Sequence, residues 1–291
     1  MHRDALGQLR RRGTRAINLH PISLAAPPQP RAVGEGRLSA KRHGSRSVLR
    51  GLRQAGAMKL VFPRSAEALQ CIVVNSAGGI TGGDRFELQA EAGEGTRLIL
   101  TTQAAERAYR AQPGPRGRVR TCLTVAQGAR LDWLPQELIL FEGCALDRRL
   151  TIELDAGARL LMVEPVVFGR AAAGERLGHA AFRDRIAVNR AGHPLYRDGI
   201  RLEGDLDAAM ATPATAAGMR AMASLLYVAP DAEAHLAPLR QMLPETGGAS
   251  LLAPDVLALR LLAPDSHALR IHLLPALDRL TGDALPTSWR L

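Results

Sequence analysis

The sequence predicts a mainly β fold in which strands stack as in a solenoid or β-helix, with a small α-helical element in the carboxyl-terminal part. From Gly34 onward, short β-like runs are separated by Gly and Pro. A strand–glycine turn–strand unit then occurs three times. Segments whose apolar residues have helical spacing come only after Gly204. With 291 residues, 46% of them hydrophobic, the chain is long enough to bury a substantial core.

Residues 1–33 are expected to form a disordered leader rich in Pro and Arg, ahead of a single domain over residues 34–291. Prolines would break any helix in the leader, at Pro21, Pro27, Pro28 and Pro30. Positive charge is concentrated between His2 and Arg64, where fourteen basic residues are opposed only by Asp4 and Glu35. The formal net charge of the chain is +10, so the remainder is close to neutral.

Strands are indicated by β-branched content and by alternation. Residues 69–74 resemble a buried strand, and residues 86–91 alternate apolar and polar side chains as in a half-exposed strand. Gly95, Gly128 and Gly157 each open a Gly-Thr-Arg-Leu or Gly-Ala-Arg-Leu sequence, at spacings of 33 and 29 residues. A unit repeated at this period is typical of stacked β architectures, although four matching residues are easily produced in a chain rich in Ala and Arg.

Helices are expected late in the chain, at about residues 207–243 and 265–280, with a strand at residues 256–262 between them. Leucines at positions 269, 273, 277 and 280 have helical spacing, which Pro275 is expected to interrupt. Met219 and Met222 lie in an Ala-, Met- and Leu-rich stretch, and methionine suits adaptable partner-binding surfaces. The alternative for this stretch is ordinary core.

The common enzyme motifs are missing from the sequence. The glycines at positions 78, 79, 82 and 83 have neither the dinucleotide spacing nor a terminal Gly-Lys-Ser/Thr, and Asp84 would repel phosphate. They are better explained by a close-packed backbone crossing. Gly-x-Ser-x-Gly and His-Glu-x-x-His are also missing.

Composition also bears on the compartment. No run of 18 apolar residues could form a membrane span, and the basic amino end has no apolar signal segment. Three cysteines without a Cys-x-x-Cys motif suit a reducing cytoplasm.

Carboxylates in apolar surroundings are the most informative polar residues. Glu164 lies within the apolar run 160–168, where it must be paired or functional; Arg170 is one available partner. When the repeats are aligned, Gln103, Gln136 and Glu164 occupy similar positions, so stacking would bring them together. Such a row of polar side chains is either a path for a hydrated cation or a hydrogen-bonded ladder.

These residues resemble the family of urease accessory proteins called UreD or UreH, from about Gly34 to the carboxyl end. The matching segments are residues 78–85, 101–110, 134–137, 139–141, Glu164, 168–171, 174–175, 285–286 and Trp289. They contain the expected structural motif residues Gly78, Gly79, Gly82, Gly83, Gln103, Tyr109, Pro135, Gln136, Gly169 and Arg170. Leu138 departs from the family, which usually has Thr there, so a polar role for that position is in doubt.

The resemblance implies a non-enzymatic maturation factor that binds UreF, UreG through UreF, and the apo-urease subunits. It implies no tightly bound cofactor and transient contact with nickel on its way to the urease active site. The acidic residues expected along that path are Asp84, Glu164 and Glu175, because a cation path needs oxygen groups at intervals. Oxygen ligands also bind nickel weakly enough to release it.

Two other classes of function remain open from the sequence. A nucleic-acid-binding module would rest on the charge of +10, although the basic arm lacks aromatic residues for base stacking. A hydrolase would rest on an arrangement of Asp84, Glu164 and a histidine that the spacing does not reveal. The function implied by the family resemblance includes neither nucleic-acid binding nor membrane binding.

Overall fold

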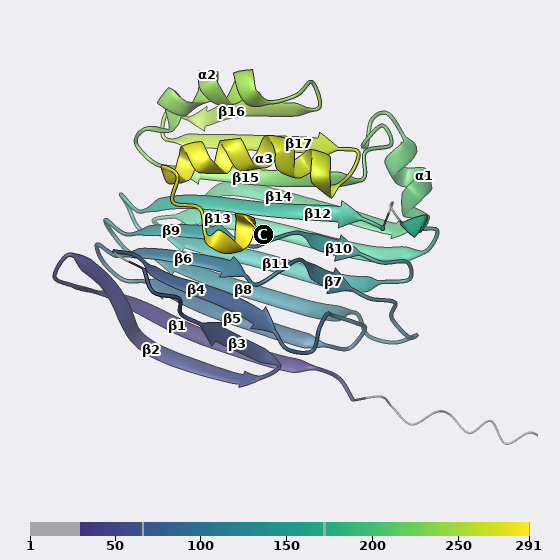
Figure 1. Cartoon of the computed structure of the whole chain (residues 1–291), viewed down its shortest axis with the longest axis horizontal. Coiled ribbons are helices and arrows are strands. Elements are labelled where there is room, and N and C mark those ends of the chain that lie inside the picture. Colours follow the sequence, from purple (N-terminus) through teal and green to yellow (C-terminus); the bar gives the residue numbers. More distant parts are fainter. Residues whose placement is uncertain (1–29, 66, 171–172, 291) are drawn as a thin grey trace, which may run out of the picture. The chain divides into compact units, whose positions relative to one another are not determined.

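Two β-sheets packed against each other make up most of the structure, which is a computed structural model (Figure 1). It describes residues 30–65, 67–170 and 173–290, so the expected leader lies almost entirely outside the described residues. The predicted mainly β, solenoid-like fold is confirmed.

The first sheet, sheet A, is parallel in its middle and antiparallel at both edges. β1, β5, β8, β11 and β13 run parallel, while β2 and β14 pair antiparallel with β1 and β13. In spatial order its described strands are β14 (His193–Gly204), β13 (Ala180–Arg190), β11 (Ala145–Leu154), β8 (Gly117–Val125), β5 (Arg85–Ala92), β1 (Val33–His43) and β2 (Arg46–Gly56).

The second sheet, sheet B, follows the same plan and extends further at one end. β4, β6, β9 and β12 run parallel, and antiparallel strands flank them. In spatial order its described strands are β16 (Gly247–Ala253), β17 (Val256–Ala263), β15 (Ala221–Val228), β12 (Arg159–Phe168), β9 (Arg130–Leu134), β6 (Arg97–Thr102), β4 (Leu69–Asn75) and β3 (Met58–Val61). Two short strands, β7 (Glu106–Ala108) and β10 (Leu138–Leu140), pair with each other, and β10 also pairs with β12.

The repeat seen in the sequence is the coil of this solenoid. Each unit places one strand in sheet A and the next in sheet B, as β5–β6, β8–β9 and β11–β12. The turns between them contain Gly95, Gly128 and Gly157, whose φ angles of 64°, 69° and 75° favour glycine. Successive coils then stack in register, so equivalent side chains lie above one another.

The main core fills the space between the sheets. Phe86, Leu88 and Ala90 point inward from β5 and alternate with exposed residues, as the sequence predicted. Nine of the ten residues of β12 are buried because this strand faces sheet A on one side and helices on the other.

A second core covers the outer face of sheet B. Helices α2 (Ala232–Met242) and α3 (Ser266–Thr281) lie over β15–β17 in Figure 1. The short 3-10 helix η2 (Thr287–Arg290) inserts Trp289, which is fully buried and donates from Nε1 to the Leu134 carbonyl oxygen at 2.9 Å. None of the described helices is both long and apolar enough to cross a membrane.

The helix predicted over about residues 207–243 is wrong in its middle. The structure has α1 (Leu206–Ala211), then strand β15, then α2. All eight residues of β15 are buried between β12 and β17, so sheet pairing overrides the helix propensity of Ala and Met. The second predicted helix is confirmed as α3, which runs through Pro275 without the expected interruption; Asp265 caps it by accepting from Ala268 N at 2.8 Å.

The glycine string joins β4 to β5 and packs tightly against neighbouring backbone. A Cβ on Gly79 would lie 2.9 Å from the Arg107 carbonyl oxygen and 2.2 Å from the Tyr109 ring. A Cβ on Gly82 would lie 2.9 Å from that of Ala111 and 3.0 Å from the Pro115 carbonyl oxygen. These approaches explain why glycine is required at both positions.

Replacing Gly82 with Val should destabilise the fold by about 1–3 kcal/mol, because the added methyl groups meet fixed backbone. Thermal unfolding would measure the loss. Gly248→Val in β16 is the matched control, since a Cβ there meets nothing within 4 Å and its φ is ordinary. A soluble Gly82→Val protein with an unchanged melting temperature would contradict this explanation.

Candidate functional site

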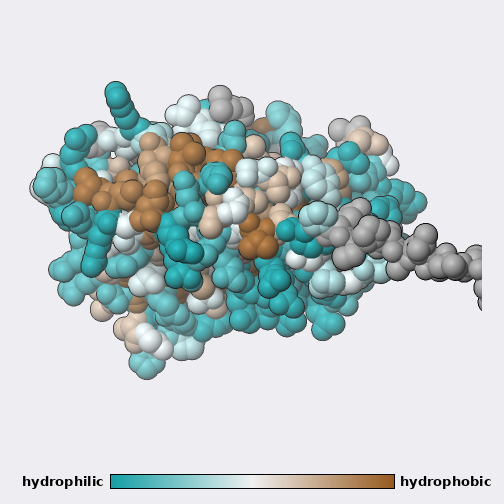
Figure 2. Space-filling view, turned by 90° about the horizontal axis from the view of Figure 1, so that it is seen from below, coloured by the Kyte–Doolittle hydropathy of each residue, from teal (hydrophilic) through white to brown (hydrophobic). Residues whose placement is uncertain are grey.

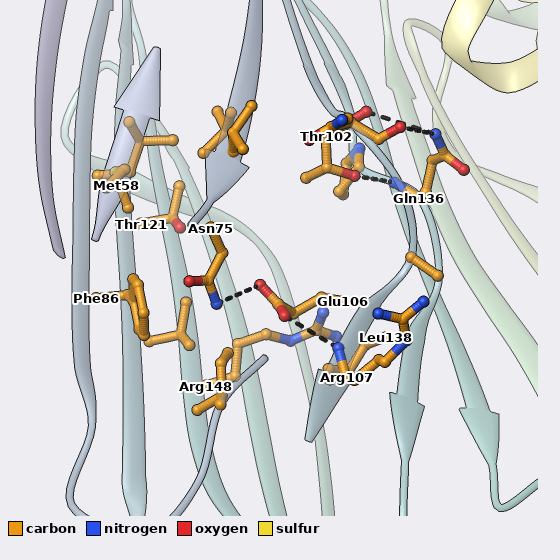
Figure 3. Close-up of a pocket in the computed structure, with 18 of the residues that line it drawn as sticks. Met58, Asn75, Phe86, Thr102, Glu106, Arg107, Thr121, Gln136, Leu138 and Arg148 are labelled. Carbon is orange, nitrogen blue, oxygen red and sulfur yellow. Dashed lines mark hydrogen bonds between the residues drawn. The ribbon is translucent and has the colours of Figure 1, made fainter. Parts of the chain in front are cut away.

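A cavity of about 340 Å³ lies between the two sheets and is the candidate site (Figure 3). Apolar side chains from both sheets form much of its wall, including Met58, Phe86 and Leu138. The polar and charged residues that line it are Asn75, Thr102, Gln103, Glu106, Arg107, Arg120, Thr121, Trp133, Gln136, Arg148, Arg149 and Glu164. The cavity is therefore an apolar space with polar groups concentrated on parts of its wall.

One polar group of the wall is centred on Glu106, at the start of β7. Asn75 Nδ2, at the end of β4, donates to Glu106 Oε2 at 3.1 Å and to the Gly79 carbonyl oxygen at 3.0 Å. Glu106 Oε1 accepts from Arg107 N at 3.0 Å. Burial raises the pKa of Glu106, while the hydrogen bond from Asn75 opposes this shift.

A second polar group joins successive coils through Gln136. Its backbone N–H donates to Thr102 Oγ1 at 2.9 Å (Figure 3). Its Nε2 donates to the carbonyl oxygens of Gln103 at 3.1 Å and Ser288 at 2.9 Å. Gln136 thus links the ends of β6 and β9 to the carboxyl-terminal segment. A hydrogen-bonded ladder was one of the two alternatives for the row of polar side chains; the other was a path for a cation.

A buried ionic network forms the deep end of the cavity. Arg148 of β11 crosses from sheet A to contact Glu164 of β12, with Nη1 2.6 Å from Oε2. The same guanidinium donates to both carboxylate oxygens of Asp184 on β13, at 3.0 and 2.5 Å. Trp133 Nε1 donates to the other oxygen of Glu164 at 2.7 Å. One guanidinium therefore serves two carboxylates inside the protein.

Opposing effects act on the charges of this network. Burial works to lower the pKa of Arg148, but the charges of Asp184 and Glu164 outweigh it and raise that pKa. Burial raises the pKa of Glu164, against the opposing effect of Arg148. Because Arg148 stays cationic, the network keeps a fixed positive charge between the two carboxylates.

A second, much smaller cavity of about 10 Å³ lies beyond the network. Its lining includes Glu164, Asp184, Asp198 and Ser224. Asp198 of β14 accepts from Ser224 Oγ at 3.1 Å and pairs with Arg260 of β17. This volume is about that of one water molecule. Carboxylates thus follow one another from the larger cavity, past Arg148, toward the partly exposed Arg260.

The structure brings three of the residues predicted from the repeat together and leaves two others apart. Gln103, Gln136 and Glu164 all line the larger cavity, as stacking of the coils predicted. Asp84 instead closes its own turn, accepting from Ala32 N and Thr81 N at 2.8 Å each. Glu175 accepts from Arg170 N at 3.0 Å and from Glu142 N at 3.3 Å. Neither Asp84 nor Glu175 is among the residues that line the cavity.

The pairing of Glu164 with Arg170 that the sequence suggested is wrong. Arg170 pairs with Glu175 at 3.1 Å, and the neighbouring Arg176 pairs with Asp207. Glu164 sits inside β12 and faces sheet A, whereas Arg170 follows the end of that strand and the turn at Gly169. Separation in sequence is therefore a poor guide to pairing here.

Other motif residues hold the loops beside the cavity. Tyr109 donates from its hydroxyl to the Gly78 carbonyl oxygen at 3.3 Å, and its ring meets Phe141 edge-on with centroids 5.0 Å apart. Pro135 is buried where the chain leaves β9. These contacts tie the glycine string to the loop that follows β10.

Met222 is buried and belongs to the core between the sheets, and Met219 is half-buried against that core. Their positions favour ordinary core over a partner-binding surface.

Sequence reasoning missed Arg148, Asp184 and Asp198. The available signal was alternation, since residues 146, 148 and 150 of β11 and residues 182, 184 and 186 of β13 share the inward face with apolar neighbours. Within the described ranges, no group of three or more His, Cys, Asp or Glu side chains is arranged to hold a metal ion. The oxygen groups instead lie one after another along the wall.

Comparison with known proteins gives a consistent result. Residues 32–290 match the family model described as UreD urease accessory protein. The chain is 52% identical over 263 residues to the urease accessory protein UreD of Roseobacter denitrificans, covering 90% of this chain and 96% of the relative. It is 52% identical to that of Ruegeria pomeroyi over 87% of this chain and 99% of the relative, and 40% identical to that of Rhizobium etli over 93% and 99%.

Replacing Arg148 with Leu should destabilise the protein by about 3–5 kcal/mol, because Glu164 and Asp184 would lose their shared buried cation. Chemical denaturation would measure the change. Arg120→Leu is the matched control: its partner Asp147 lies on the outer face of sheet A and keeps Arg185 at 2.8 Å. That control should lose no more than about 1 kcal/mol. Equal losses in the two variants would contradict a stabilising role for the buried network.

Proposed function

The chain belongs to the UreD family of urease accessory proteins, and from that premise we propose that it is a non-enzymatic scaffold for urease maturation. In this role it binds apo-urease and UreF in the cytoplasm, with UreG recruited through UreF. Nickel is cargo that passes along the protein to the urease active site, and no cofactor is tightly bound.

The proposal that nickel passes along the protein is supported by a row of side chains with oxygen atoms between the two sheets. Glu106 and Glu164 line the larger cavity, and Glu164, Asp184 and Asp198 line the smaller one. A divalent cation that leaves water needs anionic or polar oxygens at intervals, because apolar walls do not replace its hydration.

The arrangement of these groups favours transfer over storage. The carboxylates are spread along the wall and have partners already, so no described position offers a ready set of several ligands. Carboxylate and amide oxygens also bind nickel more weakly than thiolate or imidazole would. Within the buried network, Glu164 and Asp184 supply two carboxylates for the single guanidinium of Arg148, while Arg107, Arg120 and Arg149 also line the larger cavity.

The hydrolase alternative finds no support in the geometry. Asp84 and Glu164 have separate partners, and among the described residues no histidine lines either cavity.

Neutralising the cavity carboxylates, with Glu106→Gln and Glu164→Gln, should lower the nickel content of urease matured with the variant. The reason is that each change removes an anionic oxygen from the wall while keeping the size of the side chain. We expect the folded fraction to co-purify with UreF, and that fraction should be smaller for Glu164→Gln because Arg148 loses one of its two carboxylate partners. The measurement is nickel per active site in urease co-expressed with each variant, corrected for the amount of soluble complex.

Asp84→Asn and Glu175→Gln are the controls, because these residues hold loops and do not line the cavity. They should reduce the amount of folded protein without changing nickel per active site. Full nickel occupancy with both cavity variants would rule out the nickel path and leave the scaffold role standing.

A further inference from the structure

The positive charge of the described chain is gathered at one end of the two sheets. Residues 31–67 carry nine basic and two acidic residues, whereas residues 68–291 carry 24 basic and 25 acidic ones. The basic segment forms β1, β2 and β3; β2 is the outermost strand at this end of sheet A and β3 is the outermost strand at this end of sheet B. We call this end of the sheets, residues 31–64, the basic end.

Two carboxylates, Glu35 and Glu91, lie close to basic side chains of this end. Glu35 is shared by Arg37 at 2.9 Å and Arg53 at 3.6 Å, so one carboxylate serves two guanidiniums. Arg50 lies 4.0 Å from Glu91, and both side chains are largely exposed. Lys59 points outward from β3. The basic end therefore presents positive charge to solvent.

A β-bulge in β2 positions one of these side chains. Ser39 pairs with Gly51 and Ala40 pairs with Leu49, so Arg50 is the extra residue of the bulge. Bulges at sheet edges bend the strand and redirect a side chain, and a charged edge resists pairing with a second copy. The direction of the Arg50 side chain is thus set by the backbone of the bulge and not by its rotamer alone.

Apolar side chains are exposed among these charges. Val33, Leu52 and Val61 are 56%, 46% and 50% exposed. Figure 2 looks onto this end of the molecule and shows hydrophobic surface interleaved with hydrophilic side chains. Leu52 also lines a shallow groove of about 450 Å³ with Arg37 and Arg53. Arginine together with exposed apolar groups is typical of protein interfaces.

We propose that the basic end is a docking surface for a protein partner whose contact face is acidic and carries apolar side chains. A nucleic acid fits less well, because β1–β3 expose no Phe, Tyr or Trp for stacking and hold Glu35 among the arginines. The inference rests on the proposed function, since the partner is taken from the urease assembly, and it adds the surface that this partner uses.

The test uses the purified full chain and two immobilised probes, apo-urease and UreF. Arg50→Glu combined with Lys59→Glu should weaken binding to one of them by about tenfold or more at low salt. It should also flatten the dependence of the affinity on salt concentration. Arg159→Glu with Arg183→Glu, exposed positions on β12 and β13, makes the same charge change elsewhere and should alter binding less than about twofold.

A second variant tests the apolar component of the surface. Leu52→Ser with Val61→Ser should weaken the same interaction equally at low and high salt, because it removes no charge. Melting temperatures of all variants confirm that they are folded. Unchanged binding of both probes by both basic-end variants would overturn the proposal.

Two further outcomes are distinguishable. If the unchanged protein binds neither probe, the proposed function fails rather than the choice of surface alone. If a duplex DNA fragment binds the unchanged protein as tightly as either probe and Arg50→Glu with Lys59→Glu abolishes that binding, the surface is a nucleic-acid site and the proposal is overturned.

Discussion

The buried guanidinium of Arg148 is the interaction on which the interior of this protein depends. Removing a charged group from water costs several kcal/mol, so Arg148 must have carboxylates within reach. Asp184 lies beside it in sheet A and Glu164 faces it from sheet B, so the network fixes the spacing of the two sheets at this level. Apolar packing cannot continue through such a group, and the larger cavity lies directly beside it.

Stacking of coils determines what each end of the sheets must do. Strands inside the stack are paired on both sides, but the terminal strands leave backbone edges open. At the end formed by β15–β17, helices α2 and α3 cover the outer face of sheet B. At the opposite end, β2 and β3 carry arginine, lysine and a bulge in place of a covering helix. The same charges that discourage self-association are available to an acidic partner, so protection of the edge and recognition are compatible.

Much of the architecture could be predicted from the sequence because it depends on local patterns. The turns at Gly95, Gly128 and Gly157 and the alternation of residues 86–91 were sufficient to indicate stacked strands. β15 was missed because a strand buried on both faces has no alternation. The partner of Glu164 was missed for a different reason: Arg148 lies on another strand and in the other sheet, whereas Arg170 is merely closer along the chain. Pairings across the core depend on register, which local sequence does not encode.

The position of Arg148 also bears on how a cation would interact with this interior. A cation in the larger cavity meets Glu164, but one oxygen of that carboxylate already contacts Arg148 and the other accepts from Trp133. Tight binding would require displacing a guanidinium that Asp184 also holds. The electrostatic attraction of the wall is therefore balanced against a competing internal cation, which limits how long an ion can stay. Brief residence and release are what the proposed transfer of nickel requires, so this arrangement is compatible with that proposal.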